Sequence, residues 1–320
     1  MSTNTELDKN INLIVVLGAT ATGKTKLAVE LANNFHGEII SADSRQVYKG
    51  MDIGTGKDLG EYGKVPYHLI DLFTPGYQFN VFEYQHLFYK SFQDITLRSQ
   101  LPILVGGTGL YIQAILDKYD FTYAPKNNDL RKELDLLPDS ELIHKLSELK
   151  PKQHNTTDSC DRERTIRAIE IAIAEKEKSP QGTCKSTSFT EISPLVFGIK
   201  FKRSELHNRI TQRLKSRIAE GMIEEAKQLL SSGVSFDELD YYGLEYRYLS
   251  QLLQKKISRN DMFQKLNSEI KRFAKKQENY FNRMEKQGHK IHWLDGTKNV
   301  YQQALDVMNS YSQLIHRDDK

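Results

Sequence analysis

The stretch Gly18-Ala-Thr-Ala-Thr-Gly-Lys-Thr25 constrains the fold more than any other part of this sequence. It follows the apolar run Ile11–Leu17 and precedes the helical pattern Leu27–Ala32, so strand, glycine-rich loop and helix come in the order that a phosphate-binding loop requires. Two glycines in such a loop let backbone N–H groups surround an anion, and the following helix presents the positive end of its dipole. The sequence therefore predicts a site for a chain of at least two phosphates. The loop alone leaves open whether the protein is a kinase, a nucleotide hydrolase or a transferase with a diphosphate leaving group.

The predicted diphosphate-binding residues are those of this loop and two arginines further along the chain. Lys24 supplies a point charge, and the hydroxyl of Thr25 is a ligand for Mg²⁺. Arg209 and Arg213 lie four residues apart in a predicted helix, so both guanidinium groups leave the same face and each can bind a phosphate in bidentate fashion. Surface salt bridges are an equally open interpretation of the two arginines. The full predicted set is Gly18, Ala19, Thr20, Ala21, Thr22, Gly23, Lys24, Thr25, Arg209 and Arg213.

Buried strands alternate with helical patterns along most of the chain, which predicts a P-loop NTPase-like α/β fold, a parallel sheet flanked by helices. Asp43 follows one such strand, and ligands of open parallel sheets bind at the carboxyl ends of the strands, so its carboxylate is expected beside the phosphate loop. The alternative is that Asp43 only caps a turn or helix. The predicted strands are Ile11–Leu17, Glu38–Asp43, His68–Asp71, Leu101–Val105, Pro194–Lys200 and Lys290–Leu294.

Three loops near the predicted site carry further hypotheses. The glycine-dense loop Gly50–Lys57 could close over a ligand, or could be only a turn. Asp71 ends a short strand and suggests a carboxylate that holds Mg²⁺ through water. The strand Leu101–Val105 ends in glycines, where many nucleotide hydrolases have an acidic residue, which disfavours hydrolysis and leaves space for a bulky substrate near Thr108.

The chain divides into three segments by the character of its sequence. Residues 8–125 form the first part of the core, residues 126–189 a helical insertion without strand patterns, and residues 190–320 complete the core with C-terminal helices. The predicted helices of the insertion are Leu130–Leu137, Ser140–Leu149 and Asp161–Glu177. Those of the core are Val81–Leu97, Ser204–Gly221, Ile223–Leu230, Leu244–Leu253, Asn260–Lys286 and Val300–Ile315.

The composition of the chain argues against a membrane protein but does not identify a binding partner. The net charge of +3 is too small to indicate nucleic-acid binding by itself. Basic residues nevertheless gather in two predicted helices, at Arg162–Arg167 and Lys265–Lys290, where they could bind a polyanion or simply be solvated. No apolar run approaches the roughly 18 residues of a membrane span, so a cytoplasmic protein is expected. Cys160 and Cys184 have no metal-site spacing and are interpreted as incidental thiols.

Several blocks of this sequence together resemble the tRNA dimethylallyltransferase family (tRNA isopentenyltransferases). The likeness spans residues 10–295, and the block from Asp43 to Thr55 is more specific than the phosphate loop. The matching blocks are Gly18–Thr25, Ile40–Thr55, His68–Asp71, Val105–Tyr111, Arg164–Glu170, His207–Arg213, Ala274–Gln277 and His292–Leu294. The chain departs from the family's usual motifs at Asn80, at Glu163, at Tyr242–Arg247 and at Gln277–Tyr280.

The resemblance implies transfer of the dimethylallyl group from dimethylallyl diphosphate to N6 of adenosine 37 in tRNA, by a monomer that uses Mg²⁺. It implies that the helical insertion binds the anticodon stem-loop and that the target base is flipped into the site. Lys24, Thr25 and Arg213 would stabilise the departing diphosphate, and Asp43 would orient and deprotonate the adenine amine. The residues expected to bind tRNA are Asp43, Ser44, Arg45, Gln46, Thr108, Glu163, Arg164, Arg167, Lys275 and Gln277.

Three other functions stay open at this stage. One is a non-catalytic P-loop module that binds RNA, which would keep the basic helices but would lose Asp43. Prenylation of free AMP, ADP or ATP would use the same phosphate site, but it would not need the helical insertion or the basic C-terminal helices. A small-molecule kinase would need a nucleotide-base pocket and a pair of lid arginines.

Overall fold

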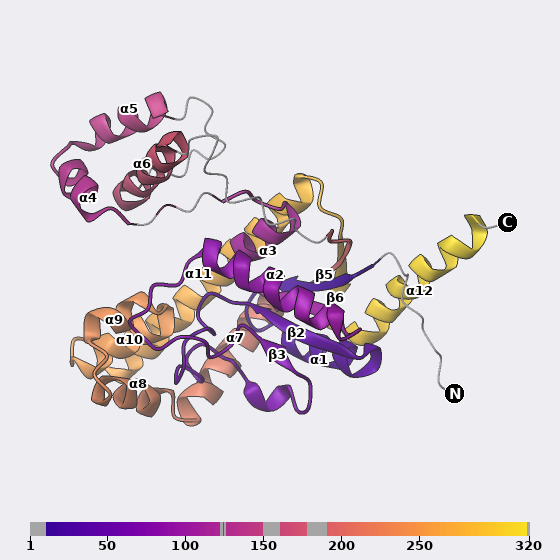
Figure 1. The fold of residues 1–320 in the computed structure, drawn as a ribbon. Helices are drawn as coiled ribbons and strands as arrows, with labels where there is room; N and C mark the ends of the chain where they lie inside the picture. Colours follow the sequence, from indigo (N-terminus) through magenta and orange to yellow (C-terminus); the bar gives the residue numbers. More distant parts are fainter. Residues whose placement is uncertain (1–10, 122–123, 125, 150–160, 178–190, 319–320) are drawn as a thin grey trace. The chain divides into compact units, whose positions relative to one another are not determined.

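Six parallel strands form one sheet in a computed structural model that describes residues 11–121, 124, 126–149, 161–177 and 191–318 (Figure 1). The strand order is β3-β2-β4-β1-β5-β6. The strands are β1 Leu13–Gly18, β2 Gly37–Ala42, β3 Tyr67–His68, β4 Leu101–Gly106, β5 Pro194–Lys200 and β6 Ile291–Asp295. Because β1 pairs with β4 on one side and β5 on the other, the phosphate loop leaves from the middle of the sheet. The predicted parallel α/β sheet is confirmed.

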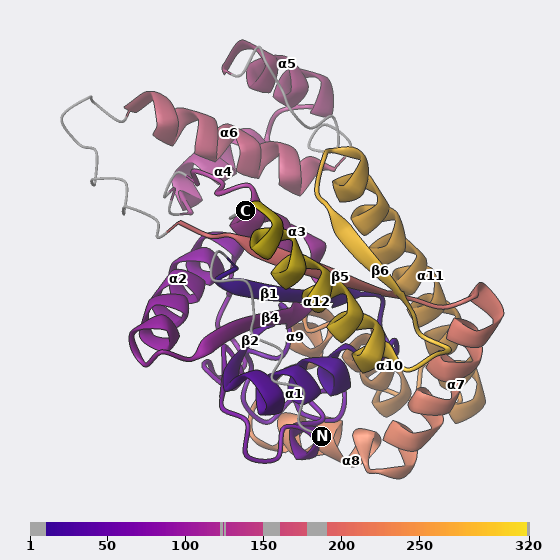
Figure 2. The same ribbon diagram turned by 90° about the vertical axis from the view of Figure 1, so that its right-hand side faces the viewer.

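Helices cover both faces of this sheet (Figure 2). Two of them, α1 (Lys24–Phe35) and α12 (Val300–Asp318), pack against each other and against the strands on one face. On the other face, α2 (Val81–Leu97), α3 (Gly109–Leu116) and α11 (Arg259–Lys286) pack together. The remaining described helices of this unit are α7 Arg203–Ala219, α8 Met222–Ser231, α9 Phe236–Tyr241 and α10 Leu244–Leu253, and a 3-10 turn lies at Leu59–Glu61.

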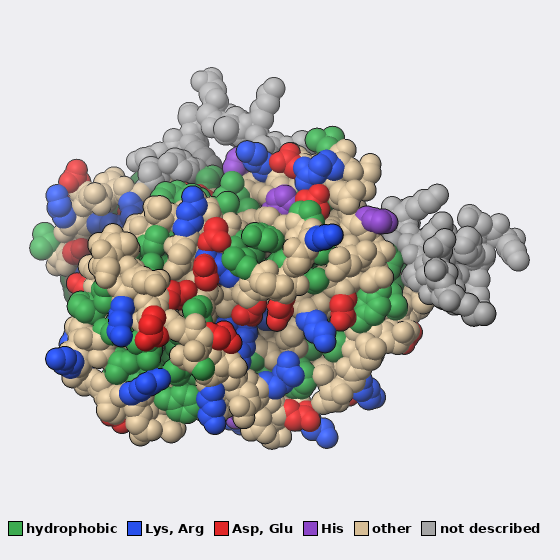
Figure 3. Space-filling view, turned by 90° about the horizontal axis from the view of Figure 1, so that it is seen from below, with side chains coloured by type: hydrophobic (Ala, Val, Ile, Leu, Met, Phe, Trp, Pro, Cys, Tyr) green, Lys and Arg blue, Asp and Glu red, His purple; other side chains and the backbone are tan. Residues whose placement is uncertain are grey.

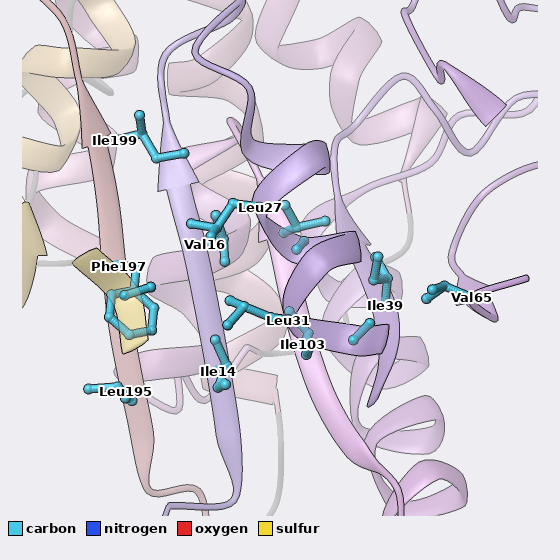
Figure 4. Packing of buried hydrophobic residues seen from close by; sticks show 14 of the residues in the cluster. Ile14, Val16, Leu27, Leu31, Ile39, Val65, Ile103, Leu195, Phe197 and Ile199 are labelled. Carbon is cyan, nitrogen blue, oxygen red and sulfur yellow. The ribbon is translucent and has the colours of Figure 1, made fainter. Parts of the chain in front are cut away.

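Successive side chains of the central strand β1 point to opposite faces of the sheet, and both faces are packed. In β1, Ile14 and Val16 point into one cluster with Leu27 and Leu31 of α1 (Figure 4). The intervening residues of β1 are fully buried as well, because helices pack on the opposite face of the sheet too. Burial on both faces is the reason that the strand reads as a continuous apolar run.

Residues Tyr119–Phe189 form a compact unit of their own, which begins before the expected residue 126. Its described helices are α4 Asn128–Asp135, α5 Asp139–Leu149 and α6 Arg162–Glu177. A small core of five buried side chains holds them together: Leu134, Leu142, Leu146, Ile166 and Ile169. Cys160 and Cys184 lie outside the described residues.

A buried carboxylate ties this helical unit together. Glu170 of α6 accepts hydrogen bonds from Arg131, from Arg167 and from the backbone N–H of Asn127, at 2.8–3.0 Å. Burial acts to raise the pKa of Glu170, but the hydrogen bonds from the two arginines and the amide outweigh it and lower the pKa to about 2. Arg167 also donates to the carbonyl of Ala124, so its guanidinium serves the fold of this unit.

Candidate active site

The phosphate loop between β1 and α1 is held in shape by contacts from its own residues and from distant helices. Lys24 Nζ and Thr22 Oγ1 both donate to the carbonyl of Ala19, at 2.7 and 2.8 Å. Gly23 has a φ of +87°, a left-handed conformation in which glycine is favoured, and α1 begins at the next residue. The first turn of α1 and the loop amides are therefore placed as an anion-binding site requires.

Two side chains from the C-terminal helices fix this loop from outside. Arg209 of α7 donates through Nε to the carbonyl of Ala21 at 2.8 Å and stacks over Phe201. Gln277 of α11 accepts a hydrogen bond from the backbone N–H of Thr20 at 2.8 Å. Ala21 adopts a φ of +63°, which is uncommon without glycine, and the contact from Arg209 helps to hold that conformation.

A cavity of about 390 Å³ opens beside the loop, within the size range of small-molecule sites. Thr20, Lys24 and Thr25 line it from the phosphate loop, and the carboxyl ends of β2 and β4 line it through residues 43–46 and 105–108. The wall is completed by Gly54–Gly56, by α7, by residues 241–247 and by α11. The carboxyl ends of neighbouring strands thus meet at the phosphate loop, as the sheet topology predicts.

Asp43 lies in this cavity directly after β2. Its Oδ1 accepts a hydrogen bond from the backbone N–H of Arg45 at 2.8 Å, which orients the carboxylate. The backbone N–H of Ser44 donates to Thr108 Oγ1 at 3.2 Å, joining this turn to the end of β4. Gln46 accepts from Ser41 and donates to the carbonyl of Gly56. The prediction that Asp43 lies beside the phosphate loop is confirmed.

Lys24 is electrostatically coupled to the residues around the cavity. Burial, together with the nearby Arg213 guanidinium, lowers the pKa of Lys24 from 10.5 to about 7, and the Asp43 carboxylate opposes that shift. An anion bound beside this lysine would favour its protonated form.

Of the two predicted arginines, the structure brings Arg213 into the cavity, where its guanidinium pairs with Asp58. Arg209 supports the loop from outside. A third arginine of α7, Arg217, lines the cavity and was missed in the sequence, although it lies four residues beyond Arg213 on the same helix face.

Known proteins resemble this chain along almost its whole length. The family model described as IPP transferase matches residues 46–284, and one described as Isopentenyl transferase matches residues 11–62. The tRNA dimethylallyltransferase 1 of Geotalea uraniireducens is 52% identical over 297 residues, which cover 93% of this chain and 97% of that protein. The tRNA dimethylallyltransferase 2 of Trichlorobacter lovleyi is 54% identical over 300 residues, which cover 94% and 97%.

This chain belongs to the IPP transferase family. A solved family structure, the full-length tRNA isopentenylpyrophosphate transferase of Bacillus halodurans, is 31% identical, has a TM-score of 0.68 and aligns with 95% of this chain and 99% of its own. The resemblance seen in the sequence is confirmed, and so is the P-loop NTPase-like fold. The protein is an enzyme of tRNA modification, a prenyltransferase.

The structure does not bring Asp71, the hypothesised magnesium ligand, into the cavity lining. The strand β3 ends at His68, and Asp71, which has a φ of +56°, does not line the cavity. Its carboxylate pairs with Lys57, which is fully buried and also contacts Asp52 at 2.5 Å and the carbonyl of Tyr48 at 2.7 Å. A buried lysine requires such partners, so Asp71 stabilises the neighbouring loop.

The glycine-dense loop Gly50–Lys57 is held by a residue that the sequence analysis did not identify. Glu225 of α8 accepts hydrogen bonds from the backbone N–H groups of Asp52 and Ile53 at 2.7 Å and from that of Gly54 at 2.9 Å. The hydroxyl of Tyr246 donates to the same carboxylate at 2.7 Å. No spacing along the chain signals this contact, because α8 lies far from the loop in the sequence.

The residues expected to bind tRNA fall into three groups in this prenyltransferase. Those of the turn after β2, with Thr108 and Gln277, line the cavity: Asp43, Ser44, Arg45, Gln46, Thr108 and Gln277. Glu163 and Arg164 are exposed on α6, whereas Arg167 is engaged with Glu170. Lys275 is exposed on α11 outside the cavity lining, and its neighbour Lys276 lines the cavity.

One face of the enzyme shows no surface that charge alone would mark for RNA binding. On the face drawn in Figure 3, lysines and arginines are interspersed with aspartates and glutamates among the described side chains. The cavity lining is more distinctive, because Arg272 and Lys276 accompany Phe273, an aromatic ring that is 44% exposed. Within the described residues, no helix combines the length and the apolar character that crossing a bilayer requires.

Proposed function

We propose that this cavity binds dimethylallyl diphosphate through its diphosphate and receives adenosine 37 of a tRNA, whose N6 amine takes the dimethylallyl group. One observation carries the proposal: the phosphate loop and the carboxylate of Asp43 line the same cavity. A site for a leaving diphosphate and a candidate proton acceptor are thereby side by side. Val105, Leu244, Ile270 and Phe273 add apolar surface to the lining, which suits a five-carbon group.

The leaving group is an anion, so the site must stabilise the charge that develops on it. As the bond from C1 of the dimethylallyl group to the diphosphate oxygen breaks, the loop amides, Lys24 and Arg213 are available to bind the departing diphosphate. These donors are already held in place by the hydrogen bonds to Ala19 and Ala21 and by Asp58.

The residues also suit Mg²⁺, which prefers oxygen ligands and substrate phosphates. Thr25 lines the cavity beside Lys24. With the diphosphate, the Thr25 hydroxyl would hold the ion. Bound there, Mg²⁺ would neutralise charge on the leaving diphosphate.

Asp43 is proposed to serve the acceptor. The exocyclic amine of adenine is a weak nucleophile, and a carboxylate that accepts one of its hydrogen bonds orients the nitrogen towards C1. As the new N6–C1 bond forms, the amine proton passes to Asp43 and then to solvent. A base in a single-stranded loop can reach such a carboxylate at lower cost than a base in a duplex.

Contacts to the rest of the RNA are assigned by exposure and charge. Arg272 and Lys276 can bind phosphates at the cavity, and the ring of Phe273 can stack on a base. On the helical unit, Arg164 is the exposed arginine of α6 that makes no ion pair among the described residues. Arg167 is not assigned to RNA, because Glu170 and Ala124 occupy its guanidinium.

The direct test incubates the enzyme with dimethylallyl diphosphate, Mg²⁺ and either bulk tRNA or AMP, and follows the products by nucleoside mass analysis. We expect prenylated adenosine in tRNA and unchanged AMP. Prenylated AMP with untouched tRNA would contradict the proposed acceptor and favour an adenylate prenyltransferase. Turnover of the γ-phosphate of ATP without affinity for the prenyl donor would contradict the proposed donor.

A further inference from the structure

We propose that Arg217 is a second diphosphate-binding arginine, which works with Arg213 and is kept in the cavity by Glu245. This inference rests on the proposed function, because it assigns part of the same donor site. It concerns a residue that lies outside the phosphate loop and outside the arginine pair expected from the sequence.

The position of Arg217 on α7 is unusual for a charged residue. The buried face of this helix consists of Leu206, Ile210, Leu214 and Arg217, at the spacing of a core-facing stripe. Arg217 is only 7% exposed, yet it lines the cavity beside Lys24 and Arg213. Burying a guanidinium on a helix face costs desolvation free energy. An anionic partner must offset this cost.

The described residues do not provide a full anionic partner for Arg217. The nearest described carboxylate oxygen, from Glu245, is 3.9 Å from Arg217 Nη1, beyond hydrogen-bond distance. Arg217 Nε is buried and has no hydrogen-bond partner among the described residues. Several of its five donors are therefore available to an anion in the cavity, whereas Glu245 is near enough to hold the guanidinium in place.

Two arginines converge at Gly56 in the cavity wall. A Cβ placed on Gly56 would lie 1.5 Å from Arg217 Nη2 and 2.9 Å from Arg213 Nη2, so both guanidinium groups lie against this glycine. Gly56 also has a φ of +64°. A diphosphate carries enough oxygens to accept bidentate hydrogen bonds from both arginines while the loop amides bind its other end.

A double-variant cycle tests this assignment against a purely structural ion pair. The variants are Arg217→Met, Glu245→Gln and the two combined, and the ligand is inorganic pyrophosphate measured by calorimetry, alongside KM and kcat with dimethylallyl diphosphate. Loss of charged hydrogen bonds predicts roughly 10- to 100-fold weaker pyrophosphate binding for Arg217→Met. We expect the combined variant to stay equally weak. Glu245→Gln, which removes the charge that holds Arg217 in place, should bind pyrophosphate more weakly than the wild type but more tightly than Arg217→Met.

A structural role gives the opposite pattern, because removing both buried charges together would restore binding to the wild-type level. Arg217→Lys keeps the pair with Glu245 and therefore the fold, and we expect a smaller loss of pyrophosphate affinity from it. Arg203→Gln, at the exposed start of the same helix, is the matched control and should change neither the pyrophosphate affinity nor the KM for dimethylallyl diphosphate.

If the wild type binds pyrophosphate and turns over while every Arg217 variant binds equally well, this inference fails and the proposed function stands. If the wild type binds neither pyrophosphate nor the donor, both fail.

Discussion

Gln277 and Thr20, which are 257 residues apart in the chain, are joined by a hydrogen bond of 2.8 Å from the backbone N–H of Thr20 to Oε1 of Gln277. Nε2 of the same side chain donates to the carbonyl of Gly107 at 2.9 Å. One buried amide therefore links the phosphate loop after β1 to the end of β4. Both segments line the cavity, so we expect this bridge to hold the two walls of the proposed donor site together.

Replacing Gln277 with Glu should weaken donor binding. A carboxylate cannot donate to Gly107, so its second oxygen would face the carbonyl oxygen, and its charge would repel the diphosphate. We expect pyrophosphate affinity to fall roughly tenfold, measured by calorimetry. Asn279→Asp, which adds the same charge at an exposed position of α11, should have little effect. Equal losses from the two variants would show that the bridge itself does not matter.

Replacing Glu225 with Gln should loosen the loop Gly50–Lys57. The carboxylate accepts three backbone N–H groups and the hydroxyl of Tyr246, and an amide nitrogen in place of one oxygen would face donors. Leaving such buried groups unpaired costs about 2 kcal/mol of unfolding free energy, which urea titration would measure. Glu224→Gln, an exposed neighbour on α8, should change stability by less than about 0.5 kcal/mol. If both variants are equally stable, Glu225 is not what holds the loop.

Donor binding should take up a proton at pH 8. The pKa of Lys24 is about 7 in the protein alone, so the amine is largely neutral at pH 8, and a bound diphosphate favours its protonated form. Affinity should therefore fall as pH rises above 7. Calorimetry in two buffers of different ionisation enthalpy measures the uptake, and Lys24→Arg, which is charged throughout, should abolish it. The same uptake in Lys24→Arg would assign the proton to another group.

Replacing Glu170 with Gln should destabilise the helical unit alone. It removes the charge that Arg131 and Arg167 share, at a cost of about 3 kcal/mol, and hydrogen exchange of residues 162–177 would report it. The native pKa of Glu170 is lowered to about 2, so its stabilisation is complete above the ordinary carboxyl pKa and is lost as pH falls towards 2. Glu163→Gln, exposed on the same helix, is the control. Protection of α6 that is identical in the two variants would contradict the role of Glu170.

Features encoded in local spacing were predictable from the sequence. The helix Val81–Leu97 was predicted with its observed bounds from its apolar spacing, and the structure adds that Asn80 caps its first turn. The strand Pro194–Lys200 was also predicted as observed. The short helix α9 was missed, although Ser235 and Glu238 form a capping box, a signal that the sequence does carry.

Contacts between distant segments could not be predicted in the same way. Asp71 has the position of a magnesium ligand in the sequence, but Lys57 takes its carboxylate in the fold. Glu225 looks like any acidic residue of an amphipathic helix until α8 meets the loop. The helical spacing of Arg217 from Arg213 could have predicted that the two lie on one face of the helix. The burial of Arg217 could not be predicted, because it depends on packing between distant segments.

The central claim is that Asp43 accepts the proton of the adenine amine beside a donor held by the phosphate loop. Asp43→Asn tests it most directly, because an amide oxygen can keep the hydrogen bond from Arg45 while losing basicity. With dimethylallyl diphosphate, Mg²⁺ and tRNA, we predict that kcat falls roughly 10³-fold while donor affinity is unchanged or tighter. Turnover close to the wild-type rate, or donor affinity lost together with turnover, would contradict the account.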